Sequence, residues 1–161
     1  MKACFSGSFD PLTNGHMDII RRAAGIFEEV DVLIMENPRK KAVFSAEERK
    51  RMIEDAIRAE GIANAGAVIG SGLTVEAVHS IGAGVIVRGV RSVTDYEYEV
   101  LQATANSMLR REIETLFLVA RPELSFLSSS VIKEIAMNGG SIKGLVPDCI
   151  FEEVSERLSH L

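Results

Sequence analysis

The first residues that could do chemistry lie in segment 7–16, which reads Gly-Ser-Phe-Asp-Pro-Leu-Thr-Asn-Gly-His. Small residues such as Gly7 and Ser8 let a ligand approach the backbone closely. Thr13, Asn14 and Gly15 are turn and cap residues, which predict that a helix begins close to His16, and helix N-termini attract anions. Because this end of a helix disfavours an imidazolium, we expect a neutral His16 that donates a hydrogen bond to a phosphate. The alternative is that His16 only packs at the start of the helix.

A second group of candidate residues is segment 88–99, Arg-Gly-Val-Arg-Ser-Val-Thr-Asp-Tyr-Glu-Tyr-Glu. It begins at the end of an apolar run. The guanidinium groups of Arg88 and Arg91 can together bind a polyanion there. Each arginine taken alone could instead form a surface ion pair. Thr94 or Asp95 is expected to cap the next helix, with Glu99 about one turn into it.

A third group is segment 124–130, Leu-Ser-Phe-Leu-Ser-Ser-Ser. Serine hydroxyls and backbone amides at a helix start can bind phosphate. Ser128 could also be a simple N-cap, since serine is a preferred capping residue. Both roles can hold, because three serines exceed what one cap needs.

These segments are positioned by alternating short apolar runs and amphipathic stretches. We predict strands at 2–6, 31–35, 67–69, 84–87 and 115–120, and helices at 16–27, 45–59, 74–80, 95–110, 128–137 and 147–158. Continuous apolar strands are typical of a parallel sheet that is buried on both faces. The alternation predicts an α/β fold, a single doubly wound, Rossmann-like domain over residues 1–161 with a five-stranded parallel sheet. In such a sheet, ligands bind beyond the carboxyl ends of the strands.

The overall composition narrows the class of protein. Hydrophobic residues make up 47% and charged residues 25% of the 161 residues, as in ordinary globular proteins. No apolar run approaches the roughly 20 residues that span a bilayer, so we expect a cytoplasmic protein without a membrane partner. The net charge of -5 argues against a nucleic-acid partner. There is also no P-loop.

Together with segment 37–41, Asn-Pro-Arg-Lys-Lys, the three segments resemble those of bacterial phosphopantetheine adenylyltransferases, a family of the nucleotidyltransferase superfamily. The resemblance implies adenylyl transfer from ATP to 4'-phosphopantetheine, which gives dephospho-CoA and pyrophosphate in the penultimate step of coenzyme A biosynthesis. It implies direct in-line attack on the α-phosphate, without a covalent enzyme intermediate. It further implies Mg2+ held largely by ATP and water, a homohexamer, and feedback binding of coenzyme A.

The resemblance also assigns roles to residues. His16 would stabilise the transition state, Ser8 would meet both substrates, and Lys40 would hold the acceptor phosphate, although the adjacent Lys41 could take its place. ATP would be bound by Ser8, Phe9, His16, Gly89, Val90, Arg91, Glu99, Leu124, Ser125, Phe126, Leu127, Ser128, Ser129 and Ser130. Phosphopantetheine would be bound by Ser8, Lys40, Thr74 and Arg88. No residue is expected to be a dedicated metal ligand.

Three rival interpretations remain at this point. Another nucleotidyltransferase, such as a glycerol-phosphate cytidylyltransferase or a nicotinamide-mononucleotide adenylyltransferase, would share segment 7–16 but not segment 88–99. A catalytically silent nucleotide-binding module would bind ATP without releasing pyrophosphate, but the intact set of candidate residues argues against it. A nucleic-acid-binding module is disfavoured by the acidic charge and by aromatic residues at only 6%.

Overall fold

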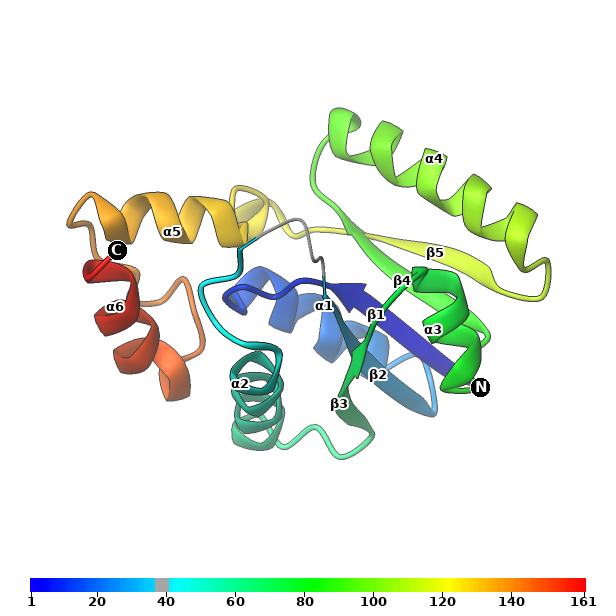
Figure 1. Ribbon diagram of the computed structural model, residues 1–161, viewed down its shortest axis with the longest axis horizontal. Helices are drawn as coiled ribbons and strands as arrows, with labels where there is room; N and C mark the ends of the chain where they lie inside the picture. Colours follow the sequence, from blue (N-terminus) through cyan, green and yellow to red (C-terminus); the bar gives the residue numbers. More distant parts are fainter. Residues whose placement is uncertain (37–40) are drawn as a thin grey trace.

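A computed structural model describes residues 1–36 and 41–161, and its centre is one parallel sheet (Figure 1). The strands are β1 (Lys2–Gly7), β2 (Glu29–Met35), β3 (Ala65–Gly70), β4 (Val85–Val90) and β5 (Glu114–Val119). Their order is β3-β2-β1-β4-β5, so the direction of winding reverses between β1 and β4. The predicted doubly wound five-stranded sheet is therefore confirmed, and its switch point lies where β1 and β4 end.

Helices follow the strands as the sequence predicts. They are α1 (Asn14–Ala24), α2 (Ala46–Ala59), α3 (Thr74–Ser80), α4 (Val93–Leu109), α5 (Ser129–Met137) and α6 (Phe151–Ser159), with short 3-10 turns η1 (Pro122–Leu124) and η2 (Asp148–Ile150). Figure 1 shows α5 and α6 together beyond the carboxyl end of β1, at the opposite end of the molecule from the N-terminus. None of the helices in the described residues is long and apolar enough to cross a membrane.

The two faces of the sheet carry separate apolar cores, because successive strand residues point to opposite sides. Phe5 belongs to the larger core, which also contains Ile20 of α1 and Ile53 of α2. Its neighbour Cys4 belongs to the smaller core with Val75 of α3. The central strand β1 is thus buried on both faces, which holds the loop after Gly7 in one place.

Four local expectations need correction. β4 continues to Val90, so Arg88 lies inside the strand and not just after it. β5, an edge strand, has no buried residue, so it is not covered on both faces. Ser92 caps α4, accepting a hydrogen bond from Asp95 N at 3.2 Å, so neither Thr94 nor Asp95 is the cap. Pro147 precedes the turn η2 instead of opening one continuous helix, and α6 begins only at Phe151.

Candidate active site

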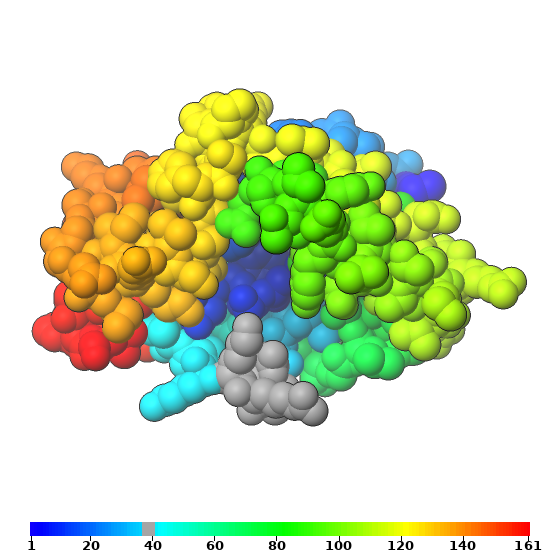
Figure 2. Space-filling view, turned by 90° about the horizontal axis from the view of Figure 1, so that it is seen from above, coloured from blue at the N-terminus to red at the C-terminus, as the bar shows by residue number. Residues whose placement is uncertain are grey.

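A cavity of about 230 Å³ lies at the switch point of the sheet. Figure 2 shows N-terminal residues, in blue, at the bottom of a hollow between the green segment around residue 90 and the yellow segment around residues 120–130. The lining residues come from all three sequence segments: Phe5, Ser6, Gly7, Ser8, Phe9, Thr13, Gly15, His16, Ile19, Arg88, Gly89, Arg91, Asp95, Glu99, Ala120, Leu124, Leu127 and Ser128. We call it the nucleotide cavity.

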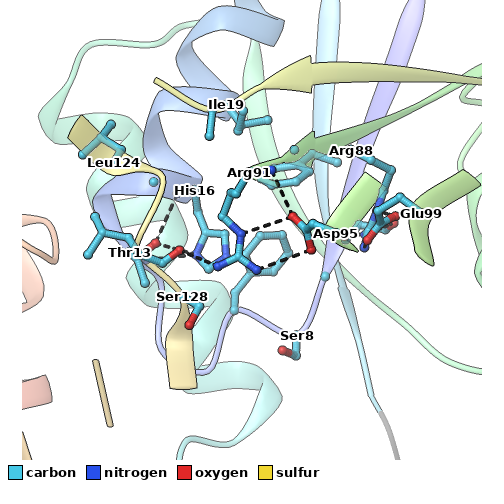
Figure 3. A pocket seen from close by; sticks show the side chains of 18 residues that line it. Ser8, Thr13, His16, Ile19, Arg88, Arg91, Asp95, Glu99, Leu124 and Ser128 are labelled. Atoms are coloured by element: carbon cyan, nitrogen blue, oxygen red, sulfur yellow. Dashed lines mark hydrogen bonds and ion pairs between the residues drawn. The ribbon is translucent and has the colours of Figure 1, made fainter. Parts of the chain in front are cut away.

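His16 is held at the start of α1 by a reciprocal capping box with Thr13. The Thr13 hydroxyl accepts from His16 N at 3.2 Å, and Thr13 N donates to His16 Nδ1 at 3.0 Å. Because Nδ1 accepts a backbone hydrogen bond, a neutral imidazole carries its proton on Nε2. That ring nitrogen remains available as a hydrogen-bond donor in the nucleotide cavity (Figure 3).

The charge state of His16 follows from its surroundings. Burial lowers the pKa of His16 from 6.5 to about 4, and the nearby positive charges of Arg91 and Arg88 act in the same direction. The imidazole is therefore neutral at pH 7, as the position at a helix N-terminus predicts. A neutral donor beside two guanidinium groups suits a polyanionic ligand.

Aromatic side chains pack against the His16 ring. The Phe9 ring meets the His16 ring edge to face at 5.1 Å between centroids, and the Phe5 ring stands 5.2 Å from Phe9. Phe9 has a φ of 50°, a region that non-glycine residues rarely occupy, and its side chain is turned into the core. A Cβ on Gly7 would lie 3.0 Å from Phe9 Cζ, so glycine is required where the ring passes.

Arg88 lies on one wall of the nucleotide cavity with both ends of its guanidinium engaged. Nε and Nη2 donate to the two carboxylate oxygens of Glu99 at 2.7 and 2.6 Å. Nη1 donates to the carbonyl and the hydroxyl of Ser6. The arginine of β4 is thereby fixed between β1 and α4. Figure 3 shows this pair on the far side of Arg91 from His16.

Arg91 connects the second and third segments. Its backbone N–H donates to Asp95 Oδ2 at 3.1 Å and its Nη1 donates to the Leu127 carbonyl at 2.9 Å. The guanidinium therefore spans the mouth of the nucleotide cavity between α4 and the loop before α5 (Figure 3). Substrate phosphates could exchange for these partners, because the side chain is about a third exposed (37%).

The serine segment forms the start of α5. Ser128 is the N-cap, accepting from Val131 N at 3.1 Å, as predicted. Ser129 donates its hydroxyl to the Pro11 carbonyl at 2.8 Å and so fastens α5 to the first loop. Ser129 and Ser130 line a second cavity of about 530 Å³, together with Ser8, Lys41 and Lys133. Ser8 is common to this cavity and the nucleotide cavity.

A third cavity lies on the other side of Arg88 and Glu99. It has a volume of about 360 Å³, and Thr74, Gln102 and Asn106 are among its lining residues. Since Arg88 and Glu99 line both cavities, this ion pair forms the wall between them. Thr74 therefore belongs to a compartment beside the nucleotide cavity.

Most of the residues expected from the sequence are brought together. The nucleotide cavity contains Ser8, Phe9, His16, Arg88, Gly89, Arg91, Glu99, Leu124, Leu127 and Ser128. Val90 is buried in the core, and Ser125 and Phe126 line none of the three cavities, with Phe126 54% exposed. The prediction for Lys40 lies outside the described residues.

Several interactions that hold the site were not predicted from the sequence. Thr13 is a cap residue, as predicted, but the reciprocal hydrogen bond from Thr13 N to the His16 ring was not expected. Asp95 was expected to cap a helix and instead orients Arg91. Asp10 belongs to segment 7–16, but its hydrogen bonds to the backbone of Val43 and Phe44 were not expected. Arg49, which is buried and donates to the Ser8 carbonyl, is marked by no local pattern.

A matching family model places this chain, with its cavity at the switch point of the sheet, among the nucleotidyltransferases. The cytidylyltransferase-like family model matches residues 4–135. A bifunctional NMN adenylyltransferase/ADP ribose pyrophosphatase from Francisella tularensis has a similar fold, with a TM-score of 0.70 and 17% identity over 98% of this chain and 49% of that chain.

Full-length relatives identify the family within this class. A phosphopantetheine adenylyltransferase from Dictyoglomus thermophilum is 49% identical over 98% of this chain and 94% of its own. One from Finegoldia magna is 47% identical, covering 98% of this chain and 96% of its own. The chain therefore belongs to the phosphopantetheine adenylyltransferases, as segments 7–16, 88–99 and 124–130 predict.

Proposed function

We propose that this enzyme transfers the adenylyl group of ATP to 4'-phosphopantetheine by direct in-line attack, forming dephospho-CoA and pyrophosphate. One observation carries the proposal. A neutral His16 lies in a cavity whose walls, Ser8 on one side and the Arg88–Glu99 pair on the other, are shared with two further compartments. A two-substrate transfer needs such adjoining compartments, and the names of the relatives, phosphopantetheine adenylyltransferases, support phosphopantetheine as the acceptor.

The chemistry requires no enzyme nucleophile. A phosphate oxygen of the acceptor forms a bond to the α-phosphorus of ATP. At the same time the bond between the α-phosphorus and the oxygen that bridges the α- and β-phosphates breaks, and its electron pair leaves with pyrophosphate. Negative charge on the α-phosphate oxygens is stabilised by His16 Nε2–H and by Arg91. Because the capping box holds His16 before substrate arrives, little reorganisation of this donor opposes the transition state.

The acceptor is assigned to the two compartments beside the nucleotide cavity. Its phosphate would meet Ser8 and Lys40, with Lys41 of the second cavity as the alternative cation. Its pantetheine arm would pass Arg88 and lie near Thr74, whose cavity contains amide side chains suited to peptide-like groups. The triphosphate of ATP would extend from His16 toward Ser128, Ser129 and Ser130.

Magnesium would bind together with ATP, as part of the nucleotide substrate. Within residues 1–36 and 41–161, no group of three or more His, Cys, Asp or Glu side chains could hold a metal ion. Mg2+ commonly binds substrate phosphates and retains several waters. We therefore propose that the ion enters as MgATP.

We further propose that the active form is a cytoplasmic homohexamer that also binds coenzyme A as a feedback inhibitor. The surface of α4 supports self-association, because Glu99 is its one buried residue. Tyr98, Leu101, Met108 and Leu109 of the same helix are 61%, 68%, 79% and 57% exposed. Several exposed large apolar side chains on one helix favour a protein–protein interface.

Pyrophosphate release tests the proposed reaction directly. We expect release from MgATP only when 4'-phosphopantetheine is present, and its loss in the His16→Ala variant. Parallel reactions with CTP and glycerol phosphate, and with ATP and nicotinamide mononucleotide, test the other nucleotidyltransferases. Release with one of those pairs alone would overturn the acceptor assignment, and ATP binding without any release would favour a silent binding module.

A further inference from the structure

The backbone of Val43 and Phe44 is held by charged side chains from three separate parts of the chain. Asp10 Oδ2 accepts from Val43 N at 3.0 Å and Asp10 Oδ1 accepts from Phe44 N at 2.9 Å. Arg49 Nε donates to the Phe44 carbonyl at 3.0 Å, and Arg157 Nη1 donates to the Val43 carbonyl at 3.2 Å. We call Asp10, Arg49 and Arg157 the ionic clamp.

The clamp satisfies every backbone polar group of these two residues, although neither belongs to a helix or strand. Most irregular segments rely on water or on turns for this purpose. Hydrogen bonds to charged groups are shorter and stronger than neutral ones, so this segment has one favoured position. The Phe44 ring is fully buried, and the Arg157 guanidinium lies 5.0 Å from its centroid.

The clamp is also joined to the active site. Arg49 Nη1 donates to the Ser8 carbonyl at 2.7 Å, so one guanidinium holds both Phe44 and the first loop. Ser8 and Lys41 line the same cavity, and Lys41 lies two residues before Val43 in the chain. The position of Lys41 relative to Ser8 is therefore set by how firmly Val43 and Phe44 are anchored.

Within the ionic clamp, Arg157 lies farthest in the sequence from Val43 and Phe44, since it belongs to the C-terminal helix α6. Its Nη2 donates to Glu48 Oε1 at 2.7 Å, and Glu48 Oε2 accepts from Ser45 N at 2.8 Å. The helix α6 thus reaches the N-cap of α2 as well as Val43. From these contacts we infer that Arg157 is a positioning residue for the acceptor side of the active site. This inference rests on the proposed function.

The chain contains a matched control for Arg157. Arg51 of α2 donates from Nη2 to both carboxylate oxygens of Glu153 in α6, at 2.6 and 2.7 Å. This pair joins the same two helices but does not contact Val43, Phe44 or Ser8. The carboxylates that pair with these two arginines, Glu48 and Glu153, are 31% and 36% exposed, so either arginine can be replaced without leaving a buried unpaired charge.

The test compares Arg157→Gln and Arg51→Gln in the full-length enzyme. We expect Arg157→Gln to raise the KM for 4'-phosphopantetheine about tenfold, the effect of losing a charge-assisted hydrogen bond. The KM for ATP and the melting temperature should match those of Arg51→Gln, which should keep the wild-type acceptor KM. Arg157→Lys, which retains one charged donor, should recover part of the loss.

Calorimetric binding of 4'-phosphopantetheine to the wild type separates this inference from the proposed function. No acceptor binding and no pyrophosphate release by the wild type would overturn both. Normal wild-type activity with equal acceptor KM values in Arg157→Gln and Arg51→Gln would overturn the positioning role alone. A parallel rise in the KM for ATP would also overturn it, because the defect would then be general.

Discussion

Arg88 and Glu99 are joined by two parallel hydrogen bonds, of 2.7 and 2.6 Å, in the wall between the nucleotide cavity and the cavity that contains Thr74. The Glu99 side chain is only 8% exposed, and its carboxylate has no other hydrogen-bond partner among the described residues. A planar guanidinium held in this bidentate way has one orientation. Glu99 therefore presents Arg88 to both compartments.

Replacing Glu99 by Gln should allow the Arg88 guanidinium to leave this orientation. We expect Glu99→Gln to raise the KM for 4'-phosphopantetheine about tenfold, because an amide can accept only one of the two hydrogen bonds. The control is Glu60→Gln, which breaks the exposed bidentate pair with Arg21 of 2.9 and 2.8 Å, and neither of these residues lines any of the three cavities. Steady-state kinetics with each substrate varied in turn makes the comparison. Equal effects of the two substitutions would contradict the orienting role of Glu99.

His16→Ala should separate catalysis from binding. Loss of one preorganised donor to a developing charge lowers kcat by roughly 100- to 1000-fold. The dissociation constant for ATP should change little, since the hydrogen bond strengthens mainly in the transition state. Single-turnover kinetics and equilibrium ATP binding measure the two quantities. His79→Ala, on the half-exposed His79 of α3, serves as the control. Equal losses in binding and rate would assign His16 to ground-state binding.

The lowered pKa of His16 predicts a pH dependence of stability. The folded pKa is about 4 and the usual value is 6.5, so the unfolded chain binds more protons between these pH values. The contribution of the neutral His16 side chain to the free energy of unfolding is complete above about pH 6.5. It is lost as the pH falls toward about 4. Over that range the wild type should lose up to about 1.4 kcal/mol per pH unit more than a His16→Gln variant. The free energy of unfolding of both proteins is measured by denaturation from about pH 4.5 to 7.5. The same pH dependence in both would contradict the lowered pKa of His16.

Gly7→Ala should lower activity through Phe9. A Cβ at this position would lie 3.0 Å from Phe9 Cζ and 3.2 Å from Cε2, so the ring must shift and its edge-to-face contact with His16 must change. We expect kcat to fall about tenfold, the effect of a loss of about 1.4 kcal/mol in transition-state stabilisation. Gly66→Ala on β3 is the matched control, since a Cβ there has nothing within 4 Å. A Gly7→Ala enzyme with wild-type kcat would show that the ring does not position the imidazole.

Self-association through α4 is tested by placing a charge on its apolar surface. Leu101 is 68% exposed, and Leu101→Glu should produce a smaller assembly in light scattering or native mass spectrometry. Burying an unpaired carboxylate at an interface is strongly unfavourable. Ile26→Glu, at a residue after α1 that is 59% exposed, should leave the mass unchanged. A Leu101→Glu protein with the wild-type mass would exclude this surface as an interface.

Local interactions explain what the sequence alone could determine. Strand and helix positions follow from apolar runs and caps such as Ser45 and Ser128, and the alternation of elements predicts the parallel sheet. The ends of parallel strands meet at one edge, which brings the three chemistry-bearing segments together. The start of α1 next to His16 follows from the same local rules, because a capping box acts within four residues.

The tertiary structure alone decides which charged side chains meet. Arg88 could have gripped a substrate or formed an ion pair, and its pairing with Glu99 depends on the packing of α4 against β4. Arg157 reaches Val43 across 114 residues of sequence, and Arg49 reaches Ser8 across 41. No local propensity governs such contacts, since long side chains are positioned by the packing of whole elements. The candidate residues were therefore readable from the chain, whereas the ion pairs that orient them were decided by the fold.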